Sequence, residues 1–371
     1  MQLQLSAEQS QLRDASRRLL ADRLTALVTQ LPEPPAHNSE KWVRDAQQLG
    51  WLGLGIPEQY GGAGGFEDLV LVHEELGRGL APSLLTALGL SARLLLHCDA
   101  GPGRDELLEQ VVAGTLLAAP VLDGDITLTQ SAGGARLDGR ALAVVDATEV
   151  TDLLVAAEGD GTTALVRVPW RSAGVTLTQR DTGCDVPSYT LSLAGVTLPA
   201  DAVVATDAGA ALASARREGV VLAAARALGG GRAVLERTVE HVRTRHQFGV
   251  SIGTFQAVQH QLSDIATALD AAGLAVARAA WSVQTGLDAA QAAAVAALAA
   301  TDAFASATLV AHQLHGGMGF VLDSPLHLWS ARAVSDPTAP RARRDLLDAL
   351  ADAVGIRGDG VLVAPQHRQP A

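Results

Sequence analysis

A long stretch without proline constrains the fold of this chain most. No proline occurs between Pro199 and Pro325, and three segments inside this stretch carry apolar residues at helical spacing, at about 208–247, 255–286 and 288–315. Proline breaks the interior of a helix, so its absence permits three helices of unusual length. Long helices joined by short connections pack as an antiparallel bundle, and a shorter segment near 341–354 would supply a fourth helix.

The remainder of the chain divides into a helical part and a part with strand-like spacing. Ser6 and Gln9 form a capping-box pattern ahead of the first apolar-periodic segment. From about residue 116, short runs rich in Val, Leu and Thr are separated by Asp-Gly and Pro-Trp turns, which indicates an antiparallel β-domain. We therefore predict a mainly α chain with a central β-domain. It would comprise an N-terminal helical domain (1–114), a middle antiparallel, barrel-like β-domain (115–205), a C-terminal four-helix bundle (206–357) and a disordered tail (358–371).

Composition excludes several classes of protein. The 28 basic and 40 acidic residues give a net charge of −12, which argues against a nucleic-acid surface. No uninterrupted apolar run of about 18 residues and no basic-then-apolar leader pattern is present, so we expect no membrane span. Cys98 and Cys184 lie far apart, which fits a reducing cytoplasm. His312 and His315 are three residues apart without a third ligand at suitable spacing, so we expect no metal site.

One charged turn interrupts the apolar bundle. Residues 243–256 read RTRHQFGVSIGTFQ and connect two of the long helical segments. Charge at a turn between core helices favours a nearby anion. The alternative is that Arg245 is a solvated cation favoured by the helix dipole.

Three motifs resemble the acyl-CoA dehydrogenase family. They are LGWLGLGIPEQYGGAGG at 49–65, RHQFG at 245–249 followed by Phe255 and Gln256, and QLHGGMGF at 313–320. The last motif runs into DSPLHLW at 323–329, as in the actinobacterial steroid-degrading branch. The resemblance covers roughly residues 5–355.

The resemblance implies a reaction and a set of partners. It implies FAD-dependent oxidation of an acyl-CoA thioester, such as one derived from a steroid, to its 2,3-enoyl form. A carboxylate would remove the α-proton while the flavin accepts the β-hydride. Electrons would pass to an electron-transfer flavoprotein or a similar acceptor.

The resemblance also implies cofactor-binding residues. Arg245 and Phe248 match the family residues that reach the FAD of a neighbouring subunit, and Gln256 matches the glutamine that follows them. Arginine suits a diphosphate because it can donate two parallel hydrogen bonds. Gln313, Gly316 and Gly317 match the turn that lies along the adenosine half of the cofactor.

Two departures from the family pattern concern the chemistry itself. The β-domain segment that would contact the flavin ring is replaced by APVLDGD at 119–125 and TQSAG at 129–133. No glutamate occurs in the late region at 332–344, where the family usually carries its base. The early base positions fall on Gly219 and Arg226, which leaves the adjacent Glu218 as a catalytic candidate; an ion pair of Glu218 with Arg216 or Arg217 is the alternative.

These departures leave three hypotheses for the function. The preferred one is a partner subunit of a heterotetrameric (α2β2) acyl-CoA dehydrogenase, in which the other chain supplies the catalytic base. The second is a catalytically complete homo-oligomer that uses an unusual base such as Glu218. The third is a flavin-free structural protein on the same fold.

Overall fold

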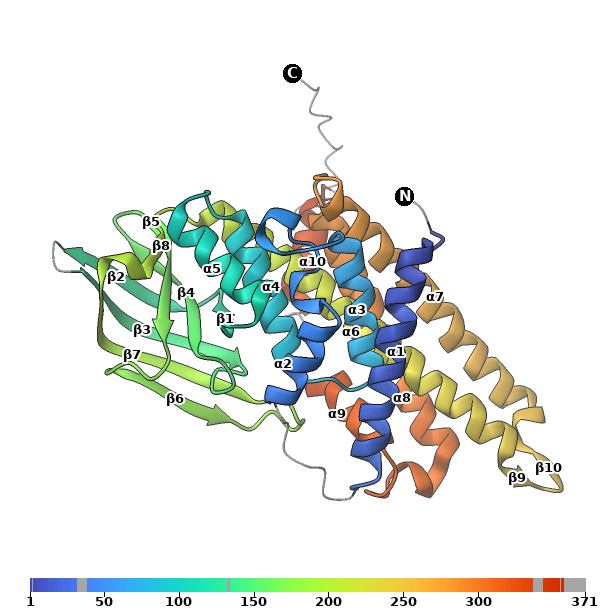
Figure 1. Ribbon diagram of the computed structural model, residues 1–371. Helices are drawn as coiled ribbons and strands as arrows, with labels where there is room; N and C mark the ends of the chain where they lie inside the picture. Colours follow the sequence, from blue (N-terminus) through green and yellow to red (C-terminus); the bar gives the residue numbers. More distant parts are fainter. Residues whose placement is uncertain (2, 32–38, 132–133, 336–342, 354, 357–371) are drawn as a thin grey trace.

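A computed structural model describes residues 1–371 except 2, 32–38, 132–133, 336–342, 354 and 357–371 (Figure 1). It confirms the predicted class: helices before and after a central β-domain. The expected tail at 358–371 lies outside the described residues, as does 336–342 within the late region that lacks a glutamate.

The N-terminal part consists of five helices. These are α1 (Ala7–Val28), α2 (Ser39–Gln48), α3 (Phe66–Arg78), α4 (Leu84–His97) and α5 (Pro102–Ala113). The predicted capping box is confirmed, because Ser6 Oγ accepts from the Gln9 amide at 3.1 Å and Gln9 Oε1 accepts from the Ser6 amide at 3.1 Å. Both bonds satisfy amides that a helix start would otherwise leave unpaired.

The central part is an eight-stranded sheet in the order β6-β7-β3-β2-β4-β5-β8, with β1 beside β4. Its strands are β1 (Ala118–Val121), β2 (Asp125–Ser131), β3 (Gly134–Val145), β4 (Asp152–Gly159), β5 (Thr162–Pro169), β6 (Val175–Arg180), β7 (Ser188–Leu198) and β8 (Val203–Ala205). Most pairs are antiparallel as expected, but β1 and β2 pair with β4 in parallel. Strand β7 unites two runs, at 189–193 and 196–198, that the sequence pattern separates.

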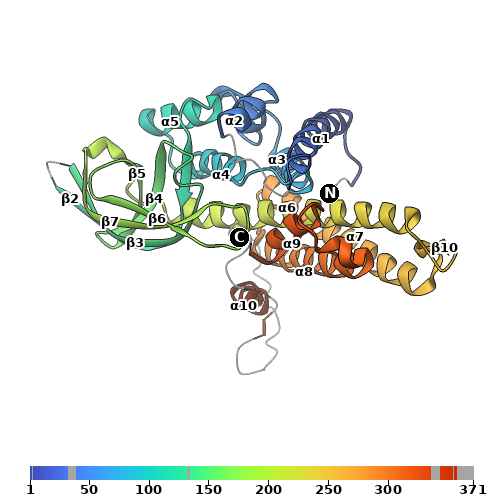
Figure 2. The ribbon, with the colours of Figure 1, turned by 90° about the horizontal axis from the view of Figure 1, so that it is seen from below.

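The C-terminal part is built on α6 (Gly209–Thr244), α7 (Gln256–Gln284) and α8 (Ala290–His315), followed by α9 (Leu326–Ser335) and α10 (Arg343–Ala353). A short hairpin of β9 (His246–Gln247) and β10 (Val250–Ser251) joins α6 to α7. Figure 2 shows α6 running from the β-domain to this hairpin at the far end of the bundle. By length and composition the segment Ala290–Gly319 could cross a membrane; in the structure it forms α8 and the turn after it, and half of its apolar window is buried.

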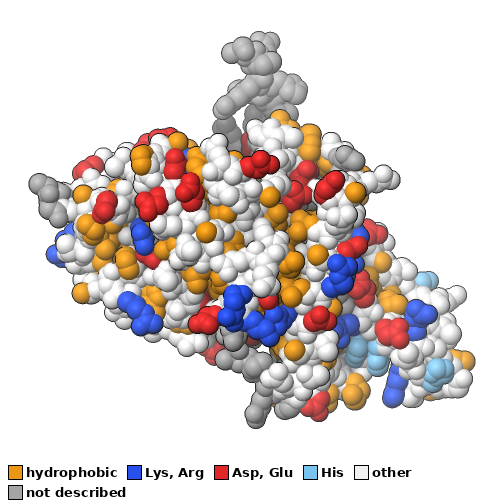
Figure 3. All heavy atoms as spheres, viewed as in Figure 1, with side chains coloured by type: hydrophobic (Ala, Val, Ile, Leu, Met, Phe, Trp, Pro, Cys, Tyr) orange, Lys and Arg blue, Asp and Glu red, His pale blue; other side chains and the backbone are white. Residues whose placement is uncertain are grey.

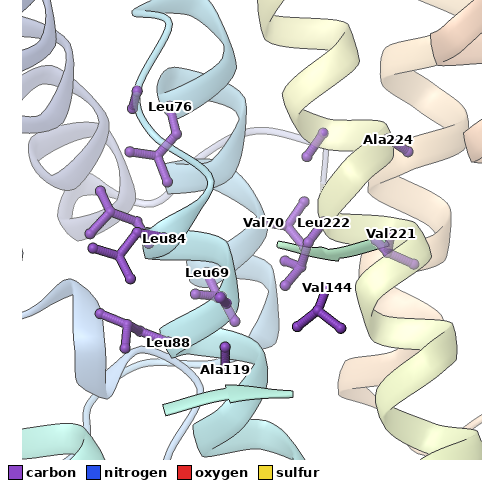
Figure 4. Packing of buried hydrophobic residues seen from close by; sticks show 14 of the residues in the cluster. Leu69, Val70, Leu76, Leu84, Leu88, Ala119, Val144, Val221, Leu222 and Ala224 are labelled. Atoms are coloured by element: carbon purple, nitrogen blue, oxygen red, sulfur yellow. The ribbon is translucent and has the colours of Figure 1, made fainter. Parts of the chain in front are cut away.

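The three parts share one hydrophobic cluster. Figure 4 shows side chains of α3, α4, α6, β1 and β3 converging, among them Leu69, Leu84, Val221 and Val144. Helices α3 and α6 approach closely because glycines face the crossing. A Cβ atom at Gly77 would lie 1.9 Å from the Arg226 carbonyl oxygen, and one at Gly229 would lie 1.8 Å from that of Glu74. The long helix α6 is thereby held against the N-terminal part.

Candidate functional site

The hairpin at the far end of the bundle holds an exposed phenylalanine in an unusual backbone conformation. Gln247 pairs with Val250, so Phe248 and Gly249 form a two-residue loop in which φ is +54° and +81°. Such a loop favours residues like Asn and Gly at positive φ, and a larger residue there is strained by roughly 1–2 kcal/mol. The Phe248 side chain is 90% exposed, and its ring packs edge-on against the ring of Phe255 with the centroids 6.2 Å apart. Strain and exposure together indicate that Phe248 serves a contact outside this chain.

Arg245 lies at the base of the same hairpin. Its amide donates to the His241 carbonyl at 2.8 Å, which closes α6, and its carbonyl accepts from Ile252 at 2.9 Å. Both ends of the residue are therefore fixed by the backbone, while the residue is exposed. Gln256 begins α7 directly after the turn and is also exposed.

The end of α8 reaches the same end of the bundle. Gln313, Gly316 and Gly317 are exposed there, and Gly316 ends the helix with φ +59°. Nothing lies within 4 Å of a Cβ atom built on Gly316 or Gly317, so their backbone is open to an extended ligand. The His315 ring stacks on His241 of α6 at a centroid distance of 4.0 Å, which joins the α6 end to the α8 end.

The structure thus brings all six predicted cofactor-binding residues to one end of the bundle. That end carries arginine and histidine side chains, which Figure 3 shows gathered on the lower right of the molecule. The sequence pattern missed His241 and the pairing role of His315, because neither residue's neighbours along the chain reveal which helices meet. These residues fit the diphosphate and adenosine half of a dinucleotide: cationic side chains beside a bare backbone.

Glu218 lies elsewhere, on the half of α6 that packs against α4. It is 2% exposed. Its carboxylate accepts from Arg93 Nε at 2.8 Å and from Arg93 Nη2 at 2.6 Å, and it lies 2.8 Å from His97 Nε2. Burial alone would raise the pKa of this carboxyl, but the hydrogen bonds from Arg93 and His97 outweigh it and hold the pKa below its usual value. A base needs a free lone pair and a raised pKa, and Glu218 has both oxygens engaged.

The predicted ion-pair partners of Glu218 were wrong. Arg216 instead donates to Asp123 Oδ1 at 3.0 Å, and Arg217 donates to Ser214 Oγ at 3.3 Å. Each residue along a helix turns the side chain by about 100°, so immediate neighbours of a buried residue face away from its partners. Asp123 belongs to the β1–β2 connection, where the family's flavin-ring segment is replaced; Arg216 therefore ties this connection to α6.

The other early base position carries a buried cation. Arg226 donates to the Ala81 carbonyl at 2.8 Å and to Thr86 Oγ1 at 3.3 Å. Arg332 of α9 donates to the same Ala81 carbonyl at 2.8 Å and pairs with both Asp185 oxygens at 2.8 and 2.7 Å. Two guanidinium groups thus fasten the α3–α4 connection to the bundle, and a proton acceptor is absent from position 226 itself.

The glycine-rich loop at 53–65 follows a 3-10 turn at Trp51–Gly53, contains a second one at Glu58–Tyr60 and closes on itself. Gly55 donates to Ala63 at 3.0 Å and Ala63 donates to Gly53 at 2.9 Å. A Cβ atom at Gly62 would lie 2.1 Å from the Ile56 carbonyl oxygen. Backbone amides that are hydrogen-bonded within the loop are not available to bind a phosphate. The glycines therefore serve the close packing of the loop on itself. Over the residues that the structure describes, no cluster of three or more His, Cys, Asp or Glu could hold a metal ion.

Comparison with known proteins agrees with this architecture. Residues 6–115 match the family profile described as acyl-CoA dehydrogenase, N-terminal domain, and residues 211–338 match acyl-CoA dehydrogenase, C-terminal domain. The acyl-CoA dehydrogenase IpdE2 of Mycobacterium tuberculosis is 30% identical over 345 residues, which cover 90% of this chain and 96% of that protein. The chain belongs to the acyl-CoA dehydrogenase family, whose members are oxidoreductases that act on CH–CH groups.

Two solved structures share the whole fold. One is described as a Tcur3481-Tcur3483 steroid ACAD variant; it has a TM-score of 0.81 and 27% identity and covers 93% of this chain and 97% of its own. The other is the ChsE4-ChsE5 complex from Mycobacterium tuberculosis, with a TM-score of 0.84 and 24% identity over 95% of this chain and 98% of its own.

Proposed function

We propose that this chain is the partner subunit of a heterotetrameric, FAD-dependent acyl-CoA dehydrogenase and that the other chain supplies the catalytic base. The observation that carries this proposal is Phe248, which is 90% exposed in a strained turn beside Arg245. A side chain in that position has a partner outside its own chain. The names of both solved structures pair two different proteins, which supports an assembly of unlike chains.

The state of the candidate base supports the same assignment. Glu218 is held by Arg93 and His97, and Arg226 occupies the other early position. When bound, FAD would accept the hydride. The part of this chain would be to hold the cofactor through Arg245, Phe248, Gln256, Gln313, Gly316 and Gly317. A steroid-derived acyl group, a flavoprotein electron acceptor and a cytoplasmic location complete the proposal; the word steroid in the description of one solved structure supports the first of these.

An exposed apolar face on the bundle supplies a surface for the partner. Leu309 of α8 is 72% exposed, and Met318, Phe320 and Leu322 follow on the turn after α8. Large apolar side chains gathered in this way mark association surfaces. They adjoin the end that carries Arg245 and Phe248, so one neighbouring chain could cover both.

Co-expression with a candidate acyl-CoA dehydrogenase partner tests the proposal. We expect one FAD per pair of unlike chains and dehydrogenase activity only in the assembled complex. Full activity and bound flavin in the chain expressed alone would instead establish the complete homo-oligomer with a base such as Glu218. Flavin absent from both the chain and the complex would establish a flavin-free structural role.

A further inference from the structure

Two histidine rings stack where α6 and α8 end. The centroids of His241 and His315 are 4.0 Å apart and the rings are inclined by 14°. His241 lies one helical turn before Arg245, and His315 directly precedes Gly316. The stack therefore lies between the two halves of the proposed cofactor-binding end.

The charges around the stack are basic. Arg237 on α6, Arg245 directly after α6 and His312 on α8 all act on one ring or the other, and His327 of α9 acts on His312. Within the described part of the chain, no carboxylate is among the charges that shift either ring. The Arg237 guanidinium lies 4.8 Å over the ring of Trp329, so it is held in place.

This environment disfavours the charged form of both rings. Burial, followed by His241, His312 and Arg237, lowers the pKa of His315 to about 4, and burial followed by Arg245 lowers the pKa of His241. The buried Nε2 atom of His315 has no hydrogen-bond partner among the described residues. An anion bound beside this ring pair would offset the neighbouring cations and raise the pKa of the pair, which would favour its protonation.

We propose that the His241–His315 pair takes up one proton when a diphosphate group binds beside it, so that this end of the bundle is a proton-linked anion site. The open backbone at Gly316 and Gly317 and the exposed Arg245 adjoin the stack and would contact the anion. One proton is expected because two charged rings 4.0 Å apart would repel each other. That the diphosphate is the one in FAD rests on the proposed function; coenzyme A carries the same group.

The sign of the pH dependence follows from linkage. An anion raises the pKa of the pair, so the complex binds more protons than the free chain, and affinity increases as the pH falls. The window extends from the pKa at which the pair takes up its first proton in the free chain, which burial and Arg245 lower at His241, up to the pKa in the complex. Within this window affinity changes about tenfold per pH unit for one proton.

ADP-ribose is the appropriate probe, because its doubly esterified diphosphate keeps a constant charge above pH 5. We expect calorimetry on the chain alone, in buffers of different ionisation enthalpy, to show uptake of one proton. Affinity should fall as the pH rises through this window, by up to about tenfold per pH unit. The double variant His241→Phe/His315→Phe keeps a stacked ring pair without a titratable nitrogen and should remove both effects; each single variant shows which ring takes up the proton.

The matched control is His260→Phe on the exposed side of α7, which should behave as the wild type. Circular dichroism checks that each variant is folded. Binding of ADP-ribose without proton uptake, or no binding at all, would overturn the inference.

The assembled complex separates the two sources of diphosphate and also separates this inference from the proposed function. If the site holds FAD, His315→Phe should lower flavin content at pH 6 and leave binding of an acyl-CoA thioester unchanged. The opposite pattern would assign the site to coenzyme A. A complex without flavin in the wild type would contradict the proposed function, while proton-linked binding of ADP-ribose would still stand.

Discussion

At the scale of single residues, Arg245 carries the most specific prediction for cofactor binding. Arg245→Ala removes a charge-assisted contact to phosphate and should weaken FAD binding by about 1.5–3 kcal/mol, or roughly tenfold or more. The measurement is flavin content and dissociation constant of the assembled complex. Arg243→Ala, an exposed arginine two residues earlier on the last turn of α6, is the control. Equal effects of both substitutions would mean that general charge, not the fixed position of Arg245, holds the cofactor.

Glu218 can be placed on its helix from the sequence, but its partners, Arg93 and His97, are distant in sequence and appear only in the structure. Glu218→Gln leaves Arg93 without a buried counter-charge and should cost about 3 kcal/mol of unfolding free energy. Turnover of the folded, assembled complex should stay near the wild-type value. Denaturant unfolding measures the first effect and steady-state kinetics the second. Glu240→Gln, exposed on the same helix, should change stability by less than about 0.5 kcal/mol; loss of turnover by several orders of magnitude in Glu218→Gln would restore it as the base.

At the scale of elements, the helices were predictable and the strand pairings were not. A segment free of proline with apolar residues at a 3.6-residue period leaves the chain few alternatives to a helix, and α6, α7 and α8 follow the expected ranges closely. Strand partners depend on residues distant in sequence, so the parallel pairing of β1 with β4 and the union of two runs in β7 carried no local signal. The same reason explains why the Arg332–Asp185 and His241–His315 contacts appeared only in the structure.

The crossing of α3 and α6 is an element-scale feature with a direct test. A methyl group at Gly77 or Gly229 would overlap a carbonyl oxygen of the opposite helix, at 1.9 and 1.8 Å, so Gly77→Ala and Gly229→Ala must push the helices apart. We expect each to cost about 2–3 kcal/mol, as other overpacked cores do. Gly89→Ala on α4 is the matched control, because the nearest atoms lie 3.6 and 3.9 Å away. Its better helix propensity should stabilise the protein by up to about 1 kcal/mol; thermal unfolding distinguishes these signs.

At the scale of the whole molecule, the proposed cofactor-binding residues lie at one end of the bundle and the exposed apolar side chains lie on one of its faces. The cofactor-binding residues come from the ends of α6 and α8 and from the hairpin between α6 and α7, and the buried charged groups Glu218, Arg226 and Arg332 hold the three parts together. This arrangement, with the proposed binding groups exposed and these charged groups buried, fits the proposal that the chain completes a site in another subunit.

That division predicts where a single charge should prevent assembly. Leu309→Asp introduces a carboxylate on the exposed apolar face of α8, and burying it against a partner without a counter-charge would cost several kcal/mol. We expect the variant to fold as a free chain and to fail to assemble with the second subunit, measured by light scattering and flavin content after co-expression. Leu142→Asp on β3, where the leucine is also exposed (52%), is the control and should assemble normally. If Leu309→Asp assembles with full flavin while Leu142→Asp does not, the partner covers the β-domain instead. The interface would then not include Arg245 and Phe248, and their proposed contribution across it would be wrong.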